Sequence, residues 1–228
     1  MINKAIASAV EALADVKDGA TILVGGFGQV GHPMALIDGL IEQGAKDLVI
    51  VCNNAGVGRS GLPRLMHMGR VRKIICSYPR TAAVFSELYA AGKLELEIVP
   101  QGTLAERIRA AGAGIGGFFT RTGAGTLLAA GKETREIDGL SYVFEKPLKG
   151  DVALIEAWQA DRWGNLTYRG SGANFNPIMA TGASLTVAQV QNIVELGEIA
   201  PDRVSTPSIF VNRIVAVPYT YPYPAIEY

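Results

Sequence analysis

The sequence has few cysteines, histidines and aromatic residues, and it has no excess of charge. Its 228 residues include 2 Cys, 2 His and 7% Phe, Trp and Tyr, and 21 Lys and Arg balance 21 Asp and Glu. Two cysteines cannot supply the four ligands of a structural zinc site, and their apolar surroundings are typical of a reducing cytosol. A net charge of zero argues against binding to nucleic acid or to a membrane surface. We therefore expect no metal site, no nucleic-acid partner and no membrane partner.

Long apolar runs and targeting signals are also missing. No stretch reaches the roughly 20 apolar residues of a membrane-spanning helix. The first residues, MINKAIASAVEALADV, lack the apolar core of a signal peptide and instead predict a short amphipathic helix on Ile6, Val10 and Leu13. With 49% hydrophobic residues the chain can bury a large core, and no repeat or linker divides it. We expect a cytoplasmic protein with a single domain over residues 1–228.

What the sequence does contain is a regular alternation of short apolar runs with segments of helical pattern. Strands are predicted at residues 20–24, 47–52, 71–77, 94–99, 142–144, 152–158, 166–168 and 185–194. Helices are predicted at residues 33–43, 62–68, 82–91, 103–111 and 178–183, and Thr103 with Glu106 has the spacing of a capping box. Residues 111–126 and 169–177 are expected to be loops, and the tail 219–228 to be extended. This alternation favours the α/β class, with a parallel sheet covered by helices on both faces.

A glycine-rich loop joins the first predicted strand to the next helix. The stretch 18–33 reads DGATILVGGFGQVGHP, and its loop comprises Gly25, Gly26, Phe27, Gly28, Gln29, Val30 and Gly31. Glycines let a backbone approach a ligand closely, and a helix N-terminus presents free N–H groups with a partial positive charge. The loop is therefore predicted to bind a phosphate, a carboxylate or a developing oxyanion.

One alternative for this loop is a dinucleotide site. Gly26, Gly28 and Gly31 fit the G-x-G-x-x-G pattern between a strand and a helix. That pattern needs an acidic residue where the second strand ends, about 20 residues further on. Here the second strand ends in asparagines, and its acid, Asp47, stands at the opposite end. The alternative of a nicotinamide-dependent oxidoreductase is weakened but stays open, as does that of a ligand-binding module without enzymatic activity.

Neutral amide side chains follow two of the predicted strands. Asn53 and Asn54 come after the second strand and Gln101 comes after the fourth. The carboxyl ends of parallel strands meet at one edge of a sheet, which is where ligands bind in such folds. Amides are neither bases nor nucleophiles, but their N–H groups can stabilise a carbonyl oxygen that gains charge. Asparagine is also common in turns for its own backbone bonds, so this residue type alone does not decide between the two roles.

Several motifs together resemble the A (alpha) subunits of the family I CoA-transferases. They are GGFGQVGHP at 25–33, NNAG at 53–56, PQGTLAERIRAAGAG at 100–114, TGAGT at 122–126 and DRWGNLTYR at 161–169, and the likeness spans about residues 2–217. NNAG, DRWGNLTYR and the run KETREIDG at 132–139 are most similar to the branch that acts on 3-oxoadipate. The resemblance implies an open, mostly parallel, Rossmann-like sheet flanked by helices.

The resemblance also implies a mechanism and a partner. In this family a glutamate of the B subunit, in a Ser-Glu-Asn-Gly motif, attacks the acyl-CoA and carries CoA as a thioester to the acceptor acid. That tetrapeptide does not occur in this sequence. The chain is therefore expected to work with a B subunit, in a heterodimer or heterotetramer that moves CoA from succinyl-CoA to a 3-oxoacid. Coenzyme A would be a substrate, and no cofactor would be bound permanently.

The sequence departs from the family pattern at three positions. Ala173 stands where the family commonly has arginine, and Glu156 and Gln159 stand where relatives tend to have basic residues. These changes bear on the acyl substrate or on how tightly CoA is held, and they leave the reaction class intact. An acid within an apolar strand also needs a partner, because an unpaired buried charge is costly. Neither His32 nor His67 is assigned a catalytic role.

Overall fold

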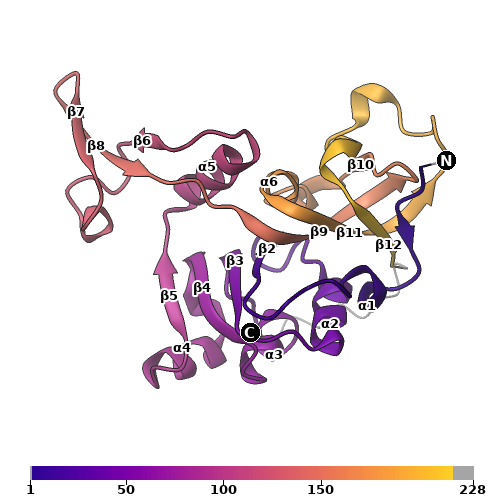
Figure 1. Ribbon diagram of the computed structural model, residues 1–228, viewed down its shortest axis with the longest axis horizontal. Coiled ribbons are helices and arrows are strands. Elements are labelled where there is room, and N and C mark those ends of the chain that lie inside the picture. The colour runs from indigo at the N-terminus through magenta and orange to yellow at the C-terminus, as the bar shows by residue number, and fades with distance from the viewer. Residues whose placement is uncertain (1, 218–228) are drawn as a thin grey trace.

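A mostly parallel sheet of nine strands forms the centre of the molecule (Figure 1). The computed structural model describes residues 2–217. The strand order is β1-β12-β11-β9-β2-β3-β4-β5, with β10 antiparallel on β9 and every other pair parallel. The strands are β1 (Ala5–Ile6), β2 (Thr21–Val24), β3 (Leu48–Asn54), β4 (Val71–Tyr78), β5 (Glu95–Ile98), β9 (Gly150–Asp161), β10 (Leu166–Thr167), β11 (Ala183–Val194) and β12 (Arg213–Ala216). The predicted open, mostly parallel α/β sheet is confirmed.

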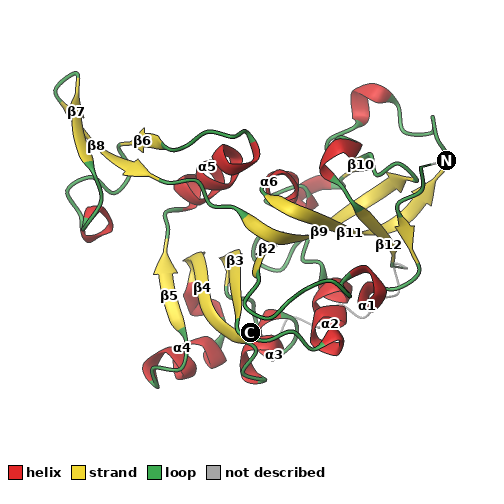
Figure 2. Ribbon diagram, in the orientation of Figure 1, coloured by secondary structure: helices red, strands yellow, loops and turns green. Residues whose placement is uncertain are grey.

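Helices cover both faces of this sheet (Figure 2). The α-helices are α1 (Ala9–Ala12), α2 (Met34–Gln43), α3 (Leu62–His67), α4 (Ala83–Ala90), α5 (Gln101–Gly112) and α6 (Asn176–Thr181). Strand side chains alternate between the faces, so Ile22 and Val24 pack in the core under α1 to α4, whereas Leu23 packs with α5 and α6. None of the helices in residues 2–217 is both long enough and apolar enough to cross a membrane.

A second, antiparallel sheet of three strands stands beyond α5, at the far left of Figure 1. Its order is β6-β8-β7, with β6 (Phe118–Thr120), β7 (Thr134–Ile137) and β8 (Leu140–Glu145). At its base the buried Glu145 accepts a 2.6 Å bond from Lys132. Short 3₁₀ helices occupy Pro79–Thr81, Leu127–Ala129, Gly170–Gly172, Pro201–Arg203 and Ser208–Phe210.

The predicted capping box on α5 is wrong. The helix begins at Gln101, with Pro100 as its N-cap residue, two residues earlier than expected. Thr103 Oγ1 is buried without a hydrogen-bond partner, and Glu106 pairs with Arg109 at 2.9 Å. Because the earlier start places Thr103 inside the first turn, its side chain faces the core. Gln101 is therefore the first residue of a helix, not the end of a strand.

Other differences lie where local patterns were short. The predicted N-terminal helix is divided, since Ala5–Ile6 is a strand that pairs with β12 and the helix spans only Ala9–Ala12. The expected loop 111–126 contains β6, and the expected loop 169–177 contains the start of α6. β12 was not predicted. The tail 219–228, expected to be extended, lies outside the described residues.

Candidate functional site

The glycine-rich loop folds into a tight hairpin turn at the carboxyl end of β2. Phe27 and Val30 exchange two backbone hydrogen bonds, each 3.0 Å long, so Gly28 and Gln29 are the two residues at its tip. Gly28 has φ +62°, and Gln29 is not among the residues with positive φ. This combination fits a type II′ turn, which takes glycine at its first central position. The loop then enters α2, which ends at Gly44 in a left-handed conformation.

Packing within the chain explains three of the loop glycines, since a Cβ atom on Gly31 would lie 2.8 Å from both Asn176 Nδ2 and the Gly172 oxygen. A Cβ atom on Gly26 would lie 2.7 Å from the His32 ring, and this residue also has φ +106°. A Cβ atom on Gly25 would clash with the side chain of Asn176. The glycines therefore serve the loop's own packing, in addition to any close approach to a ligand.

Four side chains hold the loop through its carbonyl groups. His32 Nε2 and Asn54 Nδ2 lie 2.9 and 3.2 Å from the Gly28 oxygen. Asn174 Nδ2 donates to Val30 at 3.0 Å. The fully buried Asn176 donates to Gly31 at 3.0 Å. The loop is thus fixed from both halves of the chain.

Sequence reasoning missed the two asparagines of the 169–177 segment. Asn176 bonds to three segments of the chain. Besides its bond to Gly31, its Oδ1 accepts from the Glu156 N–H at 2.9 Å and its Nδ2 donates to the Gly172 carbonyl at 2.8 Å. Asn174 has a positive φ of 21°, which is uncommon for a residue other than glycine. The sequence signal was the pair of asparagines in GANFNP. The contacts of these asparagines with the loop depend on the pairing of β9 with β2.

The three predicted amide side chains do lie together. Asn53 Nδ2 donates to Gln101 Oε1 at 3.2 Å, and Asn54 Nδ2 lies 3.5 Å from Asn53 Oδ1. Asn53 and Asn54 end β3 and are only 4% and 2% exposed, so their amide N–H groups serve partners in this chain. Gln101 is exposed, and no described residue accepts a hydrogen bond from its Nε2. Gln101 is therefore the member of this group whose donor is available to a ligand.

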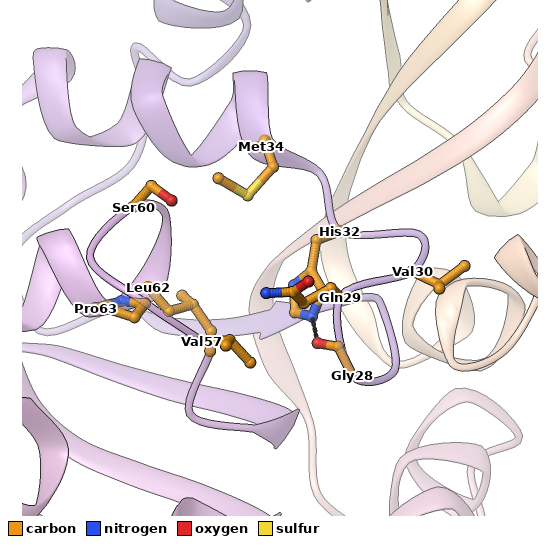
Figure 3. A pocket seen from close by; sticks show the side chains of 10 residues that line it. Gly28, Gln29, Val30, His32, Met34, Val57, Ser60, Leu62 and Pro63 are labelled. Carbon is orange, nitrogen blue, oxygen red and sulfur yellow. Dashed lines mark hydrogen bonds between the residues drawn. The ribbon is translucent and has the colours of Figure 1, made fainter. Parts of the chain in front are cut away.

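Cavities lie on both sides of the loop tip. One, of about 410 Å³, is lined by Phe27, Gln101, Gly102, Ala105, Asn174, Phe175 and Ile178. The other, of about 270 Å³, is drawn in Figure 3 and is lined by Gly28, Gln29, Val30, His32, Met34, Gly56, Val57, Ser60, Leu62 and Pro63. No charged side chain lines either cavity. These spaces suit the neutral part of a ligand, next to the donors of the loop and of Gln101.

Burial keeps His32, Cys52 and Cys76 neutral at pH 7. Burial lowers the pKa of His32, and the bond to the Gly28 carbonyl opposes this only in part. Burial raises the pKa of the Cys52 thiol well above its ordinary value and that of Cys76 to about 11. A thiol must lose its proton to act as a nucleophile, so neither cysteine is a candidate for covalent catalysis.

Glu156 has the partner that its position in an apolar strand required. Gln189 Nε2 donates to Glu156 Oε2 at 3.1 Å. Gln189 Oε1 in turn accepts from the Ala35 N–H at 3.0 Å, at the start of α2. Two other positions also differ from the family pattern. Gln159 lies on β9 beside Thr167, and the Ala173 carbonyl accepts a backbone hydrogen bond from Asn176 at 2.9 Å. Glu156 is therefore part of a network that anchors α2 to the sheet.

Comparison with known proteins gives one consistent family. The family model described as coenzyme A transferase matches residues 6–217. The chain is 60% identical to the A subunit of 3-oxoadipate CoA-transferase from Pseudomonas putida, over 95% of each chain. It is 52% identical to the A subunit of succinyl-CoA:3-ketoacid coenzyme A transferase from Xanthomonas campestris pv. campestris, over 93% of this chain and 88% of the relative.

Solved structures share the fold at low sequence identity. An acyl-CoA transferase of Escherichia coli O157:H7 superposes with a TM-score of 0.86 at 23% identity, over 99% of this chain. This chain spans only 50% of that protein's length. Glutaconate coenzyme A-transferase of Acidaminococcus fermentans has a TM-score of 0.82 at 23% identity, over 95% of this chain and 76% of its own. On the match of the family model and the identity to its relatives, the chain belongs to the coenzyme A transferase family, within the group of A subunits.

Proposed function

We propose that this chain is the A subunit of a CoA-transferase that moves CoA from succinyl-CoA to a 3-oxoacid, with 3-oxoadipate as the favoured acceptor. The observation that carries the proposal is a site that presents hydrogen-bond donors, in a sequence without the Ser-Glu-Asn-Gly motif that supplies the nucleophile in this family. The 60% identity to the A subunit of a 3-oxoadipate CoA-transferase supports the acceptor. Relatives with 3-ketoacid names support acetoacetate or another 3-oxoacid as the second candidate.

The nucleophile is a glutamate of a partner B subunit, which completes the site in a heterodimer or heterotetramer. The names of the relatives describe each of them as one subunit of a transferase, which supports a second chain. The partner's glutamate takes CoA as a thioester and passes it to the acceptor acid. Coenzyme A is a substrate in this scheme. The protein works in the cytoplasm, where acyl-CoA substrates are available.

Each predicted site residue has a role in this scheme. Gln101 donates to the carbonyl oxygen of the reacting thioester, and Asn53 holds Gln101 through its Oε1. Asn54 holds the loop at Gly28. The loop from Gly25 to Gly31 supports the reacting end of the acyl-CoA between the two cavities.

The test is reconstitution with a CoA-transferase B subunit. The chain alone is expected to be inactive with succinyl-CoA and 3-oxoadipate, and the complex to be active. A complex whose partner carries glutamine in place of the nucleophilic glutamate is the matched control and is expected to be inactive. Turnover by the purified chain alone would contradict the proposal. The ratio of kcat/KM for 3-oxoadipate to kcat/KM for acetoacetate decides between the two acceptors. Binding of NADH by the chain would instead support the oxidoreductase alternative.

A further inference from the structure

The tip of the loop carries two backbone donors that have no acceptor within residues 2–217. The N–H groups of Phe27 and Val30 are used within the hairpin turn. In contrast, no described residue accepts a hydrogen bond from the N–H of Gly28 or Gln29. Phe27 and Val30, which flank the tip, are 47% and 48% exposed. The tip therefore presents donors at the open side of the site.

Two buried side chains fix the peptide between Gly28 and Gln29. Both His32 Nε2 and Asn54 Nδ2 contact the Gly28 oxygen (Figure 3 draws the His32 bond). A carbonyl oxygen only accepts, so His32 must carry its proton on Nε2 in this contact. His32 is 7% exposed and Asn54 is 2% exposed. Together they hold this carbonyl group on the buried side of the loop.

The planarity of the peptide bond decides where the opposite group points. In a trans peptide the C=O and the following N–H point in opposite directions. Since the Gly28 carbonyl points to His32 and Asn54, the Gln29 N–H points away from them, to the open side of the tip. A donor with a fixed direction costs no reorganisation during reaction, which is what makes such donors effective.

From this geometry we infer that the Gln29 N–H is an oxyanion donor in the transfer reaction and that His32 and Asn54 are positioning residues that orient it. The inference rests on the proposed function and deepens it. When the partner's carboxylate adds to the thioester carbon, the carbonyl electron pair moves onto the oxygen. That oxygen returns the pair when the CoA thiolate leaves. The Gln29 N–H stabilises the charge on this oxygen, in addition to the donor proposed at Gln101.

Proline at position 29 tests the donor directly, because proline has no N–H. Gln29 is not among the residues with positive φ, which is one condition for proline at this position, and thermal unfolding of the assembled variant checks that the turn still forms. Gln29→Ala removes the same side chain and keeps the N–H, which makes it the matched comparison. In the reconstituted complex, Gln29→Pro is expected to have a kcat about 10²–10³ below that of Gln29→Ala, with a much smaller difference in KM. Equal kcat values for the two variants would overturn the donor role.

The positioning role is tested at His32. His32→Leu removes the donor to Gly28, whereas His32→Gln keeps an N–H near the position of Nε2. We expect His32→Leu to lower kcat about 10-fold, less than loss of a donor itself, and His32→Gln to recover most of that loss. Ile37→Val, buried on α2 and without a polar contact to the loop, is the control that lowers Tm and leaves kcat unchanged.

The outcomes separate this inference from the proposed function. An inactive wild-type complex refutes the proposed function itself. An active complex in which His32→Leu and His32→Gln lose equal activity refutes the positioning role. If His32→Leu does not assemble, the ratio of the kcat of Gln29→Ala to the kcat of Gln29→Pro decides alone. A kcat ratio near one overturns the inference.

Discussion

Replacement of Gln101 separates two roles of this side chain, the observed bond to Asn53 and the proposed donation to the reacting carbonyl group. Its Oε1 accepts from Asn53 Nδ2 at 3.2 Å, while its Nε2 is free of any described partner. Gln101→Ala removes both functions. Gln101→Glu keeps an oxygen for Asn53, removes the donor and adds a negative charge. At pH 8 an exposed glutamate is ionised, so it cannot donate.

The expected magnitudes differ between stability and turnover. In Gln101→Ala the Nδ2 of the buried Asn53 loses its acceptor, which costs about 1–3 kcal/mol of unfolding free energy. For a chain of this size that is a fall in Tm of about 2–12 °C. Loss of the donor lowers kcat by about 10² in both variants, or about 2.7 kcal/mol in activation free energy. Gln101→Glu is expected to keep a Tm near that of the wild type.

Steady-state kinetics of the reconstituted complex at pH 8 measure these effects, with thermal unfolding as the check on folding. KM for succinyl-CoA should change far less than kcat, because the bond strengthens as the carbonyl gains charge. A Gln101→Glu complex with wild-type kcat would refute the reasoning. In that case a slow Gln101→Ala complex would mean that Gln101 only supports Asn53.

Three further predictions concern the loop. Gly26→Val places a side chain against the His32 ring, so we expect kcat of the complex to fall more than about 100-fold and Tm to fall with it; a wild-type rate would contradict this. Asn176→Ala leaves buried backbone groups without partners, so calorimetry should show a loss of about 3 kcal/mol, and a loss under about 1 kcal/mol would refute it. The pKa of His32 is lowered in the fold, so stability is lost as pH falls below about 6.5, by at most about 1.4 kcal/mol per pH unit. His32→Gln should lose less Tm than the wild type between pH 7.5 and pH 5.5, and an equal loss would count against the lowered pKa.

Much of the sheet could be predicted because its strands are short, continuous apolar runs. Such runs are typical of parallel strands that are buried on both faces. The carboxyl ends of parallel strands lie at the same edge of the sheet. Asn53, Asn54 and Gln101 were placed together on that argument alone, and Asn53 does contact Gln101. The prediction worked because it needed only the order of elements and the direction of the strands.

The missed features depend on contacts between distant parts of the chain. Asn176 reaches Gly31 across 145 positions, which requires β9 to lie beside β2. The predicted capping box failed for a local reason, because α5 starts early enough to bury Thr103. β1 has only two residues, too few to show an apolar pattern, and it is stabilised by pairing with β12. In these places tertiary contacts outweighed local preference.

The chemistry proposed for the site is consistent with a division of its parts between two chains. The proposed donors are a backbone N–H group and neutral amides, and His32 is held neutral by burial. A lysine or arginine at this position would pair with the partner's carboxylate and weaken it as a nucleophile. Neutral donors instead leave that carboxylate free until a carbonyl oxygen gains charge. Because these donors cannot start the reaction by themselves, turnover should appear only when the two proposed subunits assemble.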